Sequence, residues 1–136
     1  MYADSNPARW VDPFGLYKLL NCEPSQAKVI DDAVKRAKKA SKKCLSCADQ
    51  RFFEDELEDA TIVCSKQSYS QWSPGTPVCG RTLDSPRGLA ITPAGFNSPK
   101  GCGTVAQSVF HEALHLIGYE RDWEDWIREL EQKCVQ

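Results

Sequence analysis

The pattern that most constrains this chain is His-Glu-Ala-Leu-His at residues 111–115, because it sets three polar side chains in an apolar segment. The surrounding apolar side chains recur near helical spacing and are Val105, Val109, Phe110, Leu114, Leu116 and Ile117. Residues 103–118 therefore predict a largely buried helix, which Thr104 or Ser108 begins and Gly118 ends. Buried polar groups without partners are costly, so the fold must supply partners for this polar trio.

A metal ion is the partner that this spacing favours. His111 and His115 are four residues apart, so on a helix both imidazoles lie on one face and can bind a single Zn²⁺. Glu112 then flanks the metal and can take a proton from a zinc-bound water. The alternative is a surface helix with two solvated histidines, which the apolar surroundings disfavour.

The third metal ligand has to come from another residue type, because the sequence contains only two histidines. Hydrolytic zinc sites usually have three protein ligands and one water. We take Asp122 as the third ligand, with Glu124 and Asp125 as alternatives. All three lie at the start of a second helix that is predicted to run from Asp122 to Cys134. The acidic residues there that do not bind the metal would be favourably placed at a helix N-terminus, where negative charge is stabilised.

Length and charge limit the class of protein. A chain of 136 residues predicts one domain with a modest core, and a net charge of -2 does not suggest a nucleic-acid partner. We find no signal peptide and no apolar run long enough to span a bilayer, so no membrane insertion is expected.

Seven cysteines in so short a chain indicate a disulfide-stabilised domain that functions in an oxidising environment. Cys79 and Cys102 bracket a strand and its connection to the helix at 103–118, so we predict a disulfide between them. Cys134 has three candidate disulfide partners, Cys44, Cys47 and Cys64. The odd count leaves at least one thiol without a partner in the chain.

The remaining elements are predicted from periodicity and turn residues. Residues 25–44 are predicted as a helix with Ser25 as the N-cap, followed by a short helix at 49–58. The helix at 25–44 has an apolar stripe made of Val29, Ile30, Ala33, Val34, Ala37 and Ala40. Its opposite face, Lys35–Lys43, is cationic. Strands are predicted at 61–64 and 87–92, with a loop at 65–78. This order of elements indicates an α+β fold.

Residues 79–118 resemble the zincin metallopeptidases: a cysteine, an apolar strand, a second cysteine and a HExxH helix follow one another. In that family the strand before the helix is a sheet edge that pairs with an extended peptide substrate. The resemblance implies substrate binding by Gly88, Leu89, Ala90, Ile91 and Thr92. It implies metal binding by His111 and His115, with Glu112 as general base. Arg121 stands where metzincins have a third histidine, so the chain looks closer to zincins with an acidic third ligand.

Residues 6–16 read NPARWVDPFGL and are similar to the NPxxxxDPxGL signature that ends the core of RHS-repeat proteins. In that family a large β-shell encloses a variable C-terminal toxin, which self-cleavage after the signature leucine releases. The resemblance implies that residues 1–16 are the end of an RHS core and that residues 17–136 are the toxin domain.

Together the two resemblances imply a zinc metallopeptidase toxin, secreted and delivered into a target cell or its periplasm. Its expected partners are a protein or peptide substrate, a cognate immunity protein and, before release, the parent RHS shell. Tyr119 is one candidate for a group that stabilises the reaction's oxyanion. The alternatives are a zinc amidase acting on cell-wall peptides and a non-catalytic binding module that zinc only stabilises.

Overall fold

A computed structural model of the chain describes residues 9–11, 17–67, 78–97 and 99–135. The strands are β1 (Arg9–Val11), β2 (Lys18–Leu20), β3 (Thr61–Cys64), β4 (Gly80–Asp84) and β5 (Arg87–Ile91). The helices are α1 (Pro24–Cys44), α2 (Cys47–Asp59), α3 (Pro93–Asn97), α4 (Pro99–Cys102), α5 (Val105–Leu116), the 3-10 turn η1 (Arg121–Trp123) and α6 (Glu124–Cys134). The predicted α+β class is confirmed.

The strands form one mixed sheet in the order β1-β2-β3-β5-β4. β3 runs parallel to both β2 and β5, whereas β4 is antiparallel to β5. The prediction that residues 88–92 form a sheet edge is therefore wrong, because β5 lies between two strands and β4 lies at the end. Leu89, Ala90 and Ile91 are fully buried. A continuous apolar run of this kind is typical of an interior strand, which needs cover on both faces.

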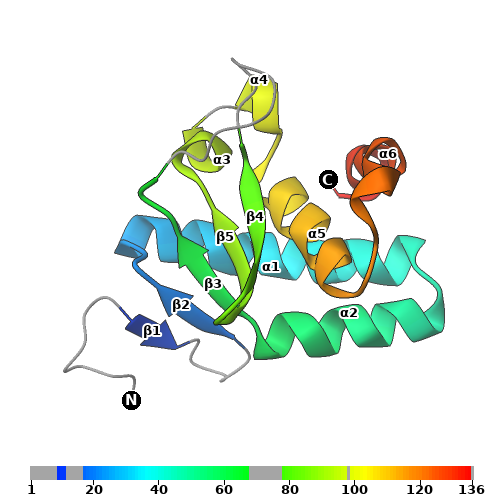
Figure 1. Cartoon of the computed structure of the whole chain (residues 1–136), viewed down its shortest axis with the longest axis horizontal. Helices are drawn as coiled ribbons and strands as arrows, with labels where there is room; N and C mark the ends of the chain where they lie inside the picture. The colour runs from blue at the N-terminus through cyan, green and yellow to red at the C-terminus, as the bar shows by residue number, and fades with distance from the viewer. Residues whose placement is uncertain (1–8, 12–16, 68–77, 98, 136) are drawn as a thin grey trace.

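The long helix α1 crosses behind the strands and packs against α5 (Figure 1). It begins earlier than predicted, because Glu23 is the N-cap in place of Ser25 and Pro24 occupies the first helical turn. Its buried stripe follows the predicted spacing from Ile30 onward, but Val29 is 42% exposed. One residue corresponds to about 100° around a helix, so Val29 points away from the stripe of Ile30 and Val34.

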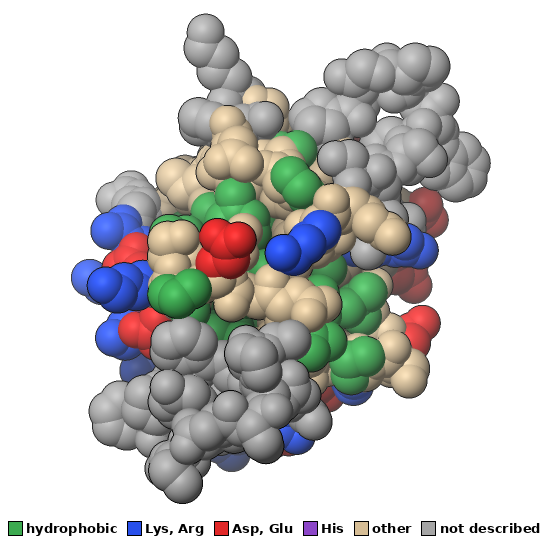
Figure 2. All heavy atoms as spheres, turned by 90° about the vertical axis from the view of Figure 1, so that its left-hand side faces the viewer, with side chains coloured by type: hydrophobic (Ala, Val, Ile, Leu, Met, Phe, Trp, Pro, Cys, Tyr) green, Lys and Arg blue, Asp and Glu red, His purple; other side chains and the backbone are tan. Residues whose placement is uncertain are grey.

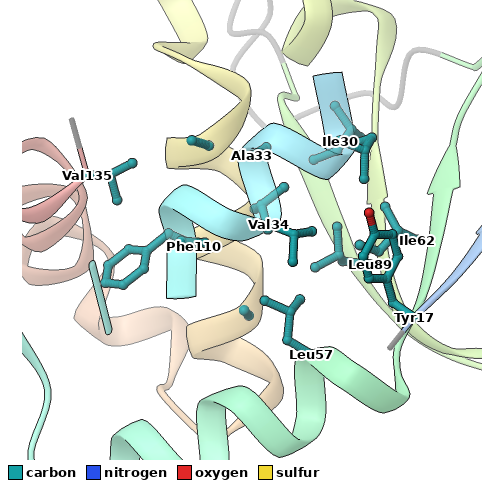
Figure 3. Packing of buried hydrophobic residues seen from close by; sticks show 14 of the residues in the cluster. Tyr17, Ile30, Ala33, Val34, Leu57, Ile62, Leu89, Phe110 and Val135 are labelled. Atoms are coloured by element: carbon teal, nitrogen blue, oxygen red, sulfur yellow. The ribbon is translucent and has the colours of Figure 1, made fainter. Parts of the chain in front are cut away.

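The core lies between the sheet and the three helices α1, α2 and α5. Figure 3 shows Ile30 and Val34 of α1 beside Ile62 of β3 and Leu89 of β5, all of them buried. Phe110 of α5 is fully buried as well, with its ring 5.5 Å from that of Phe53 in α2. The helix with the HExxH pattern is thus an interior element, as its apolar residues predicted.

Several other parts of the chain differ from the sequence prediction. The helix predicted at 49–58 is α2, which begins at Cys47, two residues before the predicted start. The Ser46 side chain sets this start, because it accepts a hydrogen bond from the Asp49 N–H. β1, β2, β4, α3 and α4 were not predicted. Most of the predicted loop at 65–78 lies outside the described residues.

Three disulfides join distant parts of the chain: Cys22–Cys64, Cys44–Cys134 and Cys79–Cys102. The predicted bridge between Cys79 and Cys102 is confirmed. Among the candidate partners of Cys134, Cys44 is the one that the structure pairs with it. Cys47 is an exposed free thiol.

We expect the Cys44–Cys134 bridge to be the main covalent support of α6. The bonded cysteines are 90 residues apart. Replacing both by alanine should lower the free energy of unfolding by about 4–5 kcal/mol, because the bridge restricts the unfolded chain. Denaturant unfolding of the double variant measures this, with Cys47→Ala as the matched control. Equal losses in the two proteins would contradict the prediction.

No helix among the described residues combines the length and apolar character needed to cross a membrane. On the face shown in Figure 2, hydrophobic, acidic and basic side chains are interspersed, and no histidine of the described residues is visible. This face is turned away from α6 (Figure 1).

Candidate metal centre

The helix that carries the candidate ligands is bounded by local signals. Thr104 is its N-cap and forms a capping box with Gln107, as the hydrogen bonds in both directions show. At the other end Gly118 has a φ of 102°, a left-handed conformation that favours glycine. The Tyr119 N–H then donates to the Leu114 carbonyl at 3.0 Å and closes the last turn. The chain can therefore reverse one turn after His115.

The reversal brings α6 back against α5, so that Glu124 lies beside both histidines. The Nε2 atom of His111 is 3.0 Å from one carboxylate oxygen of Glu124, and the Nε2 atom of His115 is 2.7 Å from the other. One ligand atom from each of the three residues lies within 4.8 Å of the other two. Both histidine side chains are only 12% exposed. These three side chains are close enough together to hold a metal ion.

The second nitrogen of each imidazole has a partner of its own. His115 Nδ1 lies 2.6 Å from the Tyr119 carbonyl oxygen, which can only accept a hydrogen bond. With a metal ion on Nε2, neutral His115 would carry its proton on Nδ1 and donate it to this carbonyl. His111 Nδ1 lies 3.5 Å from a carboxylate oxygen of Glu131 in α6. These contacts turn both Nε2 atoms toward the same point, as outer partners of metal-binding histidines do.

Glu112 is not part of the ligand group, because its side chain is turned toward β4. The Thr82 hydroxyl donates a hydrogen bond to Glu112 Oε1 at 3.0 Å. Gly80 makes the close approach of β4 possible, since a Cβ there would lie 3.1 Å from Glu112 Cγ and 3.0 Å from the Ala90 carbonyl oxygen. The candidate general base is thus held between the metal ligands and the end strand of the sheet.

Carboxylates dominate the electrostatics of the cluster. Burial lowers the pKa of His111, but its hydrogen bond with Glu131 and the charges of Glu112, Glu131 and Glu124 outweigh burial and raise that pKa to about 9. Burial raises the pKa of Glu112, and the two histidines offset only part of this effect. For Glu124, burial acts upward, but His111 and His115 lower its pKa overall. The same negative charges that favour a proton on His111 favour a bound dication.

The residues present fit Zn²⁺. Two imidazole nitrogens and one carboxylate form a ligand set that is typical of catalytic zinc, and three protein ligands leave a position for water. The half-buried cluster holds the carboxylate of Glu124, with those of Glu112 and Glu131 next to it, so a bound cation would balance the negative charge. His111, His115 and Glu124 would hold the ion.

Other predicted site residues lie elsewhere. Asp122, our first choice as third ligand, does not join the cluster; it is exposed and lines a separate pocket together with Asp125. Glu124, an alternative, is the acidic residue that lies beside the two histidines. The Tyr119 hydroxyl donates to Asp49 at 3.0 Å, so it is not directed at the metal ligands as an oxyanion donor. Residues 88–92 are separated from the end of the sheet by β4.

Two residues of the site were not predicted from the sequence. Thr82 is in β4, a strand without an apolar pattern, and Glu131 is one of several acids on α6. The only sequence signal for Glu131 is that it lies seven residues after Glu124, which places both on one face of a helix. Comparison with protein-family models, curated proteins and solved structures gave no match to this chain.

Glu124→Ala is expected to weaken zinc binding about 10²-fold, because a carboxylate ligand is lost. Asp122→Ala is the matched control and should leave zinc binding unchanged, because this side chain does not reach the histidines. Competition with a coloured chelator measures both affinities. A loss of affinity in Asp122→Ala with none in Glu124→Ala would return Asp122 to the ligand set.

Proposed function

We propose that this protein is a zinc-dependent hydrolase that cleaves peptide bonds. The observation that carries the proposal is the convergence of His111 Nε2 and His115 Nε2 on Glu124, with Glu112 one residue along the same helix. His111, His115 and Glu124 would hold the metal with a fourth position left for water, and Glu112 would act as general base, which together are what metal-assisted hydrolysis requires.

Bound Zn²⁺ would supply a Lewis acid and lower the pKa of a coordinated water toward about 7. Glu112 is the group of this chain that takes the proton of the attacking water and later delivers it to the leaving amine. Thr82 keeps the Glu112 carboxylate in place through the hydrogen bond from its hydroxyl. Tyr119 and Glu131 keep the imidazoles in orientation through contacts to their Nδ1 atoms.

The substrate edge that fits this site is β4 in place of β5. The Ser65 N–H donates to the Ile91 carbonyl, so the backbone groups of Ile91 face β3. Backbone groups alternate along a strand, and the register then directs those of Thr82 away from β5, at the end of the described sheet. An extended peptide that paired there would lie beside the residue that holds Glu112.

Digestion experiments test the proposed reaction class. The zinc-loaded protein is incubated with a mixture of denatured bacterial proteins and, separately, with purified peptidoglycan. We expect new peptide N-termini in the first mixture, detected by mass spectrometry after N-terminal labelling, and no such products after chelation. Release of cell-wall peptides alone would support a zinc amidase. No product in either mixture, from protein that contains zinc, would support a binding module.

We also propose that the hydrolase is the toxin domain of an RHS-repeat protein, secreted and countered by an immunity protein. This proposal rests on the sequence resemblance, and the signature residues 12–16 lie outside the described residues. Tyr17 supports a boundary at residue 17, because it is 4% exposed and its hydroxyl donates to Asp31 of α1. The three disulfides are compatible with an oxidising destination.

Expression of residues 17–136 in the periplasm of a bacterium tests this boundary and the need for an inhibitor. We expect the fragment to stop growth, because β1 is the sole described element it lacks and lies at the other end of the sheet from β4. The Glu112→Gln fragment is the control and should be tolerated. If the active fragment folds, binds zinc and is harmless where residues 1–136 kill, the boundary is wrong. Harmlessness of both would remove the need for an immunity protein.

A further inference from the structure

A pocket of about 830 Å³ lies where α2, the end of α5 and the start of α6 meet. It is separate from the metal ligands, although Tyr119 borders both regions: its carbonyl oxygen contacts His115 and its ring lines the pocket. The residues on which the inference rests are three aromatic and three acidic ones, namely Tyr119, Trp123, Trp126, Asp49, Asp122 and Asp125.

The three aromatic rings take two orientations, inclined to each other by 72–77°. The Tyr119 ring stacks on Trp126 with a centroid distance of 5.5 Å and an interplanar angle of 11°. Trp123 stands edge-on to both rings, with centroids 5.6 Å from Tyr119 and 6.0 Å from Trp126. Trp123 and Trp126 are nevertheless 43% and 48% exposed. Two large aromatic side chains left in contact with water around one pocket indicate a binding surface.

The pocket is also strongly acidic. Asp49 comes from α2, Asp122 from η1 and Asp125 from the first turn of α6, and no lysine or arginine is among the described side chains that line the pocket. The N-termini of α2 and α6 contribute about half a positive charge each, which is well below the three negative charges of the aspartates. A net negative potential therefore remains next to the ring faces.

Ring faces together with carboxylates select an organic cation. A guanidinium group suits both, because its plane stacks on aromatic rings and its N–H groups bind carboxylates in pairs. The volume is that of a site for a drug-sized ligand, so one guanidinium leaves room for the atoms that carry it. We propose that this acidic aromatic pocket binds the arginine side chain of a polypeptide segment. The inference does not depend on the proposed hydrolysis.

Titration of the full chain with N-acetyl-Gly-Arg-Gly-amide, followed through the tryptophan indole N–H signals in NMR spectra, tests the proposal. The signals of Trp123 and Trp126, assigned with the Phe variants, should shift with saturation. The peptide with citrulline in place of arginine has nearly the same shape without the charge. The citrulline peptide should have an affinity at least about tenfold lower, because the charge-assisted contacts are lost.

The variant Asp122→Asn/Asp125→Asn should lose about tenfold in affinity for the arginine peptide. The matched control is Asp55→Asn/Glu129→Gln, which removes the same charge from exposed positions outside the pocket and should keep its affinity. Equal binding of the citrulline peptide, or an equal loss in the control, would overturn the assignment. Equal affinity for guanidinium chloride and for the peptide would exclude a polypeptide as the ligand.

Discussion

Replacing Glu112 by glutamine is expected to lower the rate of peptide hydrolysis about 10²- to 10⁴-fold, which is the usual contribution of a general base. The amide cannot take a proton from water, but it has nearly the same shape and can still accept the hydrogen bond from Thr82. The fold and the zinc content should therefore stay as they are. The rate is measured with a peptide identified in the digestion experiment, and zinc is measured by elemental analysis.

The matched control for this variant is Glu120→Gln, which removes an exposed carboxylate four residues after Leu116 and should keep full activity. Hydrolysis by the Glu112 variant at the rate of the unmodified protein would exclude Glu112 as the base. Loss of zinc in the same variant would point instead to a role of Glu112 in metal binding.

Removal of a histidine ligand is expected to have the second large effect. Structural zinc sites bind with about 10–16 kcal/mol over four ligands, so one ligand accounts for roughly 2.5–4 kcal/mol and its loss weakens binding about 10²- to 10³-fold. His115→Ala should show this loss, because its Nε2 is 2.7 Å from Glu124 and its Nδ1 is already bound to Tyr119. Calorimetric titration of metal-free protein with Zn²⁺ measures it.

Thermal unfolding gives an independent control on the same ligand. A metal that binds the folded chain stabilises it by about 4 kcal/mol at a concentration 1,000 times its Kd. A chelator should therefore lower the unfolding temperature of the unmodified protein and have little effect on His115→Ala. An equal response of both proteins to the chelator would mean that the stabilising metal is bound elsewhere.

Local patterns in the sequence determined the helix that carries His111 and His115. Three signals act within this segment: the spacing of its apolar residues, the cap by Thr104 and the glycine at 118. Each involves only nearby residues, so none of them depends on the rest of the fold. The pair His111 and His115 shares a face on any α-helix. The long helix α1 was predictable for the same reason, apart from its first turn.

The identity of the carboxylate beside the two histidines depended on tertiary structure. Asp122, Glu124 and Asp125 are within one turn of each other, so the sequence could not distinguish the side that faces α5. The rotation of α6 about its axis decides this, and it is set by burial of Ile127 and by the bridge from Cys134 to Cys44. Glu124 consequently faces the histidines, and the two aspartates face the acidic aromatic pocket.

The order of the strands was likewise decided only in three dimensions. The apolar run at 89–91 indicated a strand, but β4 has the sequence GRTLD, without the alternation that would have predicted its partner. Its pairing with β5, and its contact with Glu112 through Thr82, are contacts between residues about 30 positions apart or joined by a turn. The sequence by itself determined which residues could bind a metal and which could act as a general base. The packing of α6 and β4 against α5 decided which of these residues meet. That packing depends on burial across the whole core, which no local pattern specifies.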